Sequence, residues 1–159
     1  MLHQQLRDYF LYPCLNKLGL WSKSAEELLV LTYAQESKGG KYIHQVEGPA
    51  LSGFQIEPTT HDDIWKSYLV NHPDLSYNIL THLEYSRIPK AEQMMNNIAY
   101  AVMMARIHYR RVEERLPDAD DVDGLASYWK RYYNTEKGSG TVEQAVKSYC
   151  DYVGIKKSK

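Results

Sequence analysis

Residues 34–60 read AQESKGGKYIHQVEGPALSGFQIEPTT and join two segments of different character. The apolar helical run that precedes this stretch should end near residue 37, because two glycines follow at positions 39 and 40. Residues 40–57 contain glycines, prolines and scattered apolar residues, which favour short extended pieces and turns. Pro58 suits the first turn of a further helix. The stretch therefore predicts a helical protein interrupted by one small β or irregular region at about 40–57.

Two helices are expected before this region. The first covers residues 3 to about 18, where apolar residues recur at every fourth position, and Pro13 should bend or split it. The second should begin at Ala25, because Ser24 and Glu27 have the spacing of a capping box.

More helices are expected after the irregular region. Their predicted starts are Pro58, Pro73, a position near residue 90, the residue after Asp121, and the residue after Thr141, which opens a second capping box. The segment from about 90 to 115 should be the longest helix, and its apolar residues on several sides predict a central position. The sequence therefore predicts a mainly α fold, with six or seven helices around a long central helix.

The length of 159 residues suits one domain that spans the whole chain. Within it, we expect the N-terminal helix in residues 1–20 and a frayed basic tail at 155–159.

Composition and charge exclude several classes of function. The formal net charge of -1 provides no general attraction to nucleic acid or to an acidic membrane. No apolar run is long enough to cross a bilayer, and the first residues lack the pattern of a signal peptide. We therefore expect a soluble product made in the cytoplasm, with neither nucleic acid nor membrane as a partner.

Cysteine and histidine spacing predicts no metal and no cofactor. Cys14 and Cys150 lie near opposite ends of the chain, too few and too distant for a metal site or a disulfide framework. Free buried thiols are favoured over a clasp between the termini, although spacing leaves both open. The six histidines lack the paired spacing of a zinc site, and the chain has no phosphate-binding glycine loop.

Glu36 is the candidate catalytic residue. It lies at the end of an apolar helix, where packing can remove water from the carboxyl group and the negative end of the helix dipole lies nearby. Both effects raise the pKa of a carboxyl group. A protonated carboxylic acid beside a groove is what cleavage of a glycosidic bond requires, because the leaving oxygen must receive a proton.

Four stretches, in this order, carry a resemblance to a known superfamily: Ala34-Gln35-Glu36-Ser37, residues 48–60, residues 96–101, and Tyr133-Asn134 followed by Gly138 and Gly140. Together they resemble lytic transglycosylases and goose-type lysozymes of the lysozyme-like superfamily. The chain departs from the family pattern where a glycine usually lies three residues before the glutamine, since Ser52 stands there.

The resemblance implies a lysozyme-like α+β fold and a role for each matching residue. Glu36 would be the general acid and then the general base, and Ser37 would hydrogen-bond near Glu36 or the substrate. Gln55 would contact an N-acetyl group or a ring oxygen. Tyr133 would orient the catalytic carboxyl group, and Asn134 would shape the end of the cleft. The implied substrate is bacterial cell-wall peptidoglycan, cut at the β-1,4 bond between MurNAc and GlcNAc.

Two chemistries use this scaffold, and the Glu-Ser pair favours a lytic transglycosylase, which needs one carboxyl group. A muramidase usually needs a second carboxylate, for which Glu47 and Glu57 are the candidates, ahead of Asp62 and Asp63.

A third possibility is a non-catalytic module of a phage virion or secretion apparatus that binds glycan without cutting it. The absence of an export signal favours a phage product. Such a protein would be carried in the virion with other virion proteins, or held in the host cytoplasm before release, and would act on the periplasmic or extracellular wall.

Overall fold

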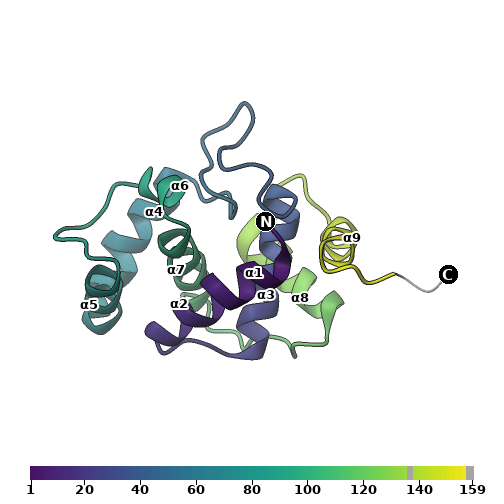
Figure 1. Ribbon diagram of the computed structural model, residues 1–159, viewed down its shortest axis with the longest axis horizontal. Helices are drawn as coiled ribbons and strands as arrows, with labels where there is room; N and C mark the ends of the chain where they lie inside the picture. The colour runs from purple at the N-terminus through teal and green to yellow at the C-terminus, as the bar shows by residue number, and fades with distance from the viewer. Residues whose placement is uncertain (136–137, 157–159) are drawn as a thin grey trace.

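The computed structural model describes residues 1–135 and 138–156, and helices dominate that part of the chain (Figure 1). The first half contains α1 His3–Leu6, the π-helix η1 Arg7–Leu11, α2 Tyr12–Lys17, α3 Lys23–Ser37, α4 Pro58–Asp63, the π-helix η2 Ile64–Tyr68 and the 3-10 helix η3 Leu69–Asn71. The second half contains α5 Pro73–His82, α6 Gln93–Asn96, α7 Ile98–Arg110, α8 Val122–Trp129, the π-helix η4 Lys130–Asn134 and α9 Val142–Val153. The mainly α prediction is confirmed.

The N-terminal helical segment has the predicted extent, and it stays continuous through Pro13 with a π-helical turn before it. Pro13 lies in the first turn of α2, directly after the π-helical turn η1. A proline there removes a backbone donor where the ladder is already widened. Gly19 follows with a φ of +68°, a left-handed conformation that glycine adopts without strain and that ends the helix.

Helix α3 begins two residues earlier than predicted. The N-cap is Ser22, whose Oγ accepts a hydrogen bond from the Ala25 backbone N at 3.0 Å, so the predicted capping box at Ser24 is wrong. Glu27 cannot reach back to close such a box, because it accepts hydrogen bonds from Arg7 at 2.7 and 2.9 Å. The predicted end is confirmed: α3 stops at Ser37, and Lys38 takes a left-handed conformation.

The prediction of one long helix over about 90–115 is wrong. Asn97 is extended (φ -134°, ψ 102°) and its Oδ1 accepts a hydrogen bond from the Tyr100 N at 3.1 Å, so α7 begins at residue 98. It ends at Arg110, well before Pro117, and with 13 residues it is shorter than α3 with 15. Most of its side chains are nevertheless buried.

The segment between α3 and α4 is irregular, as predicted, and projects at the top of Figure 1. Its β structure consists of isolated bridges between His44 and Leu51 and between Leu51 and Ile56. Ser52 has a φ of +69°, a region that favours glycine. Ser52 thus holds a backbone conformation that glycine adopts more readily than serine.

The C-terminal helices follow their predicted caps. The Asp121 Oδ1 accepts from the Gly124 N at 2.9 Å, and Thr141 and Gln144 form the predicted capping box. Helix α9 packs against α3 and α8 and ends at Gly154. Of the predicted basic tail at 155–159, residues 157–159 lie outside the described residues.

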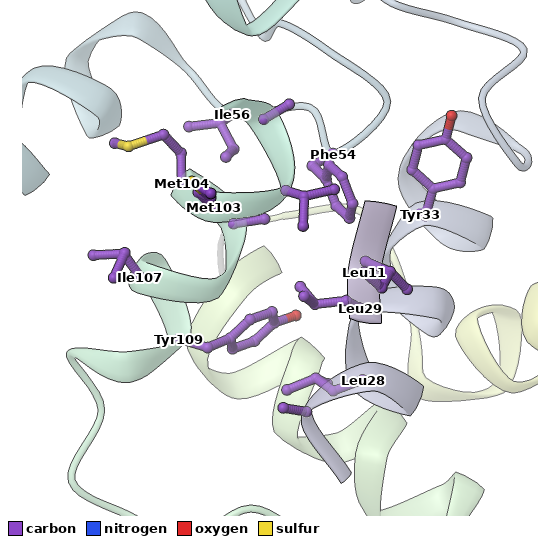
Figure 2. Packing of buried hydrophobic residues seen from close by; sticks show 14 of the residues in the cluster. Leu11, Leu28, Leu29, Tyr33, Phe54, Ile56, Met103, Met104, Ile107 and Tyr109 are labelled. Carbon is purple, nitrogen blue, oxygen red and sulfur yellow. The ribbon is translucent and has the colours of Figure 1, made fainter. Parts of the chain in front are cut away.

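Helices α3 and α7 contribute many of the buried core side chains, and the irregular segment adds Leu51, Phe54 and Ile56. Figure 2 shows Leu28 and Leu29 of α3 beside Tyr109 of α7, with Phe54 and Ile56 placed over them. Cys14 and Cys150 are buried free thiols. No helix in the described part of the chain is long and apolar enough to cross a membrane.

Candidate active site

An open groove of about 630 Å³ lies where the end of α3 meets the irregular segment and η4. Glu36 comes from α3, Gln55 and Glu57 from the irregular segment, and Tyr133 and Asn134 from η4. Residues separated by almost a hundred positions therefore line one groove, whose volume suits a small-molecule or sugar ligand.

Glu36 is the most perturbed carboxyl group of this groove. It lies in the last turn of α3, and Trp129 Nε1 donates a hydrogen bond to its Oε1 at 2.8 Å. Burial raises the pKa of Glu36 to about 7, and the hydrogen bond from Trp129 opposes this rise only in part. The carboxyl group therefore exchanges a proton near neutral pH, which suits a group that first donates and then accepts a proton.

Trp129, the hydrogen-bond partner of Glu36, is a residue of the candidate site that the sequence did not indicate. It is fully buried at the end of α8, and its indole can donate one hydrogen bond and accept none. Gly140 permits its position, since a Cβ there would lie 2.6 Å from the Trp129 Cη2. The apolar pattern of α8 indicated only a core residue, and Gly140, which follows Tyr133-Asn134 in the sequence, was the one nearby signal.

Tyr133 lies in the groove but contacts a different partner from the one predicted. Its hydroxyl donates to the Phe54 carbonyl oxygen at 2.6 Å, and its ring stacks on Tyr109 at 5.0 Å between centroids. Burial, followed by the nearby charge of Glu36, raises the pKa of Tyr133 well above its usual value. Tyr133 thus fastens η4 to the irregular segment beside Glu36, while the hydrogen bond to the carboxyl group comes from Trp129.

Gln55 and Asn134 both line the groove with part of their amide groups engaged. Gln55 Nε2 donates to the Ser52 carbonyl oxygen at 2.7 Å, and Asn134 Oδ1 accepts from Lys130 Nζ at 2.7 Å. These bonds engage Gln55 Nε2 and Asn134 Oδ1, and no described residue hydrogen-bonds to the side-chain oxygen of Gln55 or to the NH₂ group of Asn134.

The structure does not bring Ser37 into the groove. Ser37 is fully buried, its Oγ donates to the Tyr33 carbonyl oxygen at 3.0 Å and accepts from the Gly40 N at 2.9 Å. Ser37 thus caps the C-terminus of α3 and stabilises the helical turn that carries Glu36.

The two candidate second carboxylates are placed differently. Glu57 is exposed, lines the groove, and makes no capping hydrogen bond although it occupies the N-cap position of α4. Glu47 is exposed and lies outside the groove lining. Of the two, Glu57 is therefore the one that shares a groove with Glu36.

Among residues 1–135 and 138–156, no group of three or more histidine, cysteine or acidic side chains could hold a metal ion. Comparisons with known protein families, with curated proteins and with solved structures found no match.

Proposed function

We propose that this protein cleaves the β-1,4 bond between MurNAc and GlcNAc of peptidoglycan, as a lytic transglycosylase with a lysozyme-like fold. The observation that carries the proposal is a carboxyl group with a pKa of about 7, lining an open groove and held by a neutral donor. At about pH 6, roughly nine in ten molecules with such a group carry the proton.

The reaction needs this one carboxyl group twice. Glu36 gives its proton to the glycosidic oxygen, the bond from that oxygen to C1 of MurNAc breaks, and positive charge develops at C1. The ionised Glu36 then removes the proton from the C6 hydroxyl of the same MurNAc, whose oxygen bonds to C1. The products are a 1,6-anhydro-MurNAc end and a free GlcNAc hydroxyl, and Glu36 is protonated again.

The surroundings of Glu36 suit both steps. Trp129 can donate its hydrogen bond to Glu36 Oε1 whether the carboxyl group is protonated or ionised. No described residue hydrogen-bonds to Glu36 Oε2, so this oxygen can carry the proton that is transferred. Because Trp129 is uncharged, it does not hold Glu36 permanently ionised, as a lysine or arginine partner would.

The resemblance seen in the sequence also supports the proposal. Glu36, the turn that contains Gln55, and the Tyr133-Asn134 pair belong to three of the four stretches that carry it, and they line one groove. In the fourth stretch, Asn97 caps α7.

The second candidate function is hydrolysis by a muramidase, and Glu57 is the observation that favours it. Its carboxylate is exposed in the same groove and is not engaged in helix capping, so it is free to activate water.

Mass spectrometry of the products from purified peptidoglycan tests the proposal. A 1,6-anhydro end is expected, and a reducing end with one added water would identify the muramidase instead. If the protein binds the wall but releases no fragments, it is a glycan-binding module and the proposed enzymatic function is wrong.

A further inference from the structure

His108 lies in the groove, and none of the roles discussed above uses it. It comes from α7, lines the groove, and packs against the Tyr133 ring with 4.6 Å between centroids. Burial, and secondly the charge of Arg111, lower the pKa of His108 to about 4, so the ring is neutral in the pH range where Glu36 exchanges its proton.

The position of the proton on this ring follows from its neighbour. Arg111 Nη2 lies 2.9 Å from His108 Nδ1, and a guanidinium group donates hydrogen bonds but cannot accept them. Nδ1 must therefore be the unprotonated acceptor, and the single proton of the neutral ring lies on Nε2. Arg111 is itself held by Asp63 of α4, with 3.0 Å between its Nη1 and the Asp63 Oδ2.

The Nε2–H group belongs to a side chain that lines the groove and is only partly buried. No residue in the described part of the chain hydrogen-bonds to it. Among the described residues, the side-chain nitrogens that have neither solvent access nor a hydrogen bond are His3 Nδ1 and Arg111 Nε. His108 Nε2 has no hydrogen bond and is not among them, so it keeps some solvent access. A donor with no partner among the described residues, on a side chain that lines the groove, is available to a ligand.

We propose that His108 is a substrate-binding residue that donates its Nε2–H to the carbonyl oxygen of a substrate acetamido group. This inference rests on the proposed function, which supplies a polymer of N-acetylated sugars. An amide carbonyl is the strongest uncharged acceptor on such a polymer, and an uncharged donor needs no anionic partner. Gln55 lines the same groove, and its side-chain oxygen, to which no described residue hydrogen-bonds, offers an acceptor to an amide N–H group.

Binding measurements on the Glu36→Gln variant test the inference without turnover. Titration calorimetry would compare N-acetylchitotetraose with cellotetraose, which has the same β-1,4 backbone but lacks the acetamido groups. Adding His108→Phe, which keeps a stacking ring but removes the donor, should weaken N-acetylchitotetraose binding roughly tenfold and leave cellotetraose binding unchanged. Adding His108→Gln, which retains an N–H donor, should restore part of the loss.

The outcomes separate this inference from the proposed function. If Glu36→Gln binds N-acetylchitotetraose and His108→Phe leaves that affinity unchanged, the role of His108 is wrong while the proposed function stands. If Glu36→Gln binds neither oligosaccharide, the inference fails, while the proposed function is decided separately by the products released from peptidoglycan.

A second measurement examines the proton position without any ligand. In ¹⁵N NMR spectra near neutral pH, His108 should show a protonated Nε2 and an unprotonated Nδ1, and Arg111→Met should release this preference. A proton on Nδ1, or a charged ring at pH 7, would overturn the inference, and the same spectra show whether each variant is folded.

Discussion

Replacing Glu36 with glutamine should stabilise the folded protein at neutral and alkaline pH, and the gain should disappear in acid. Burial raises the pKa of Glu36 from 4.5 to about 7 in the folded protein. Between these two values the folded protein holds a proton that the unfolded chain has released, so the free energy of unfolding falls as pH rises. Above about pH 7 both states are ionised, and the loss levels off.

The size of the effect follows from the two pKa values. They differ by about 2.5 (7 minus 4.5), and each pKa unit corresponds to about 1.4 kcal/mol. The ionised carboxyl group therefore lowers the free energy of unfolding by about 3 kcal/mol. Glutamine has nearly the same shape, carries no charge at any pH, and can still accept the hydrogen bond from Trp129.

Urea denaturation followed by circular dichroism measures the effect. The variant and the wild type should have nearly equal stability at about pH 4, and the variant should be more stable by about 3 kcal/mol at about pH 8. Glu47→Gln is the matched control, because it removes the same charge at an exposed position outside the groove lining. A stability difference for Glu36→Gln that stays constant with pH would refute the reasoning.

Three further substitutions test the surroundings of the site. Trp129→Phe removes the donor that lowers the pKa of Glu36, so the alkaline limb of the pH–activity profile should move to higher pH; an unchanged limb in rate measurements would count against this contact. Gly140→Ala places a methyl group 2.6 Å from Trp129 Cη2 and should reduce wall cleavage at least roughly tenfold by displacing the indole, with circular dichroism showing an intact fold; full activity would mean that the indole position does not matter. Arg7→Met leaves the buried Glu27 without its main partner and should lower the free energy of unfolding by about 3 kcal/mol at pH 7. Because the pKa of Glu27 is lowered from 4.5 to about 2, the pair contributes fully above about pH 4.5 and its contribution is lost as pH falls toward 2. The stability difference between wild type and Arg7→Met, measured by urea denaturation, should therefore shrink over this range. An equal difference at pH 7 and at pH 2 would argue against the pair.

Local signals in the sequence were sufficient for most helix ends. Asp121, the Thr141-Gln144 box and Gly154 act through contacts within a few residues, so their spacing alone predicted them. The start of α3 was predicted wrongly because Glu27 pairs with Arg7, twenty residues away, and not with the backbone of Ser24. A capping box cannot be distinguished from a distant ion pair without knowing which helices pack together.

The prediction of one long helix was wrong for a related reason. Asn97 belongs to one of the four stretches that carry the resemblance, but an asparagine followed by a helical run is also typical of an N-cap, and Asn97 is the N-cap of α7. Beyond residue 110, the chain follows tertiary contacts such as the hydrogen bond from the Tyr128 hydroxyl to the Glu114 carbonyl oxygen at 2.8 Å, which no periodicity encodes.

The candidate site also contains residues that the sequence predicted and contacts that it could not predict. Glu36, Gln55, Tyr133 and Asn134 were predicted, and the structure places all four in one groove. The donor to Glu36 comes from position 129 and the tautomer of His108 is fixed by Arg111, and both depend on side-chain geometry across the fold. Ser37 shares the motif of Glu36 but points the other way, because neighbouring residues on a helix face different directions.

The most direct test of the central claim compares the release of soluble fragments from purified peptidoglycan by the wild type and by Glu36→Gln at about pH 6. Since the variant should be at least as stable as the wild type, any loss of activity reports chemistry and not unfolding. We expect the wild type to release fragments and the variant to be slower by roughly a factor of a hundred or more. Equal release by the two proteins would contradict the assignment of Glu36 as the proton donor.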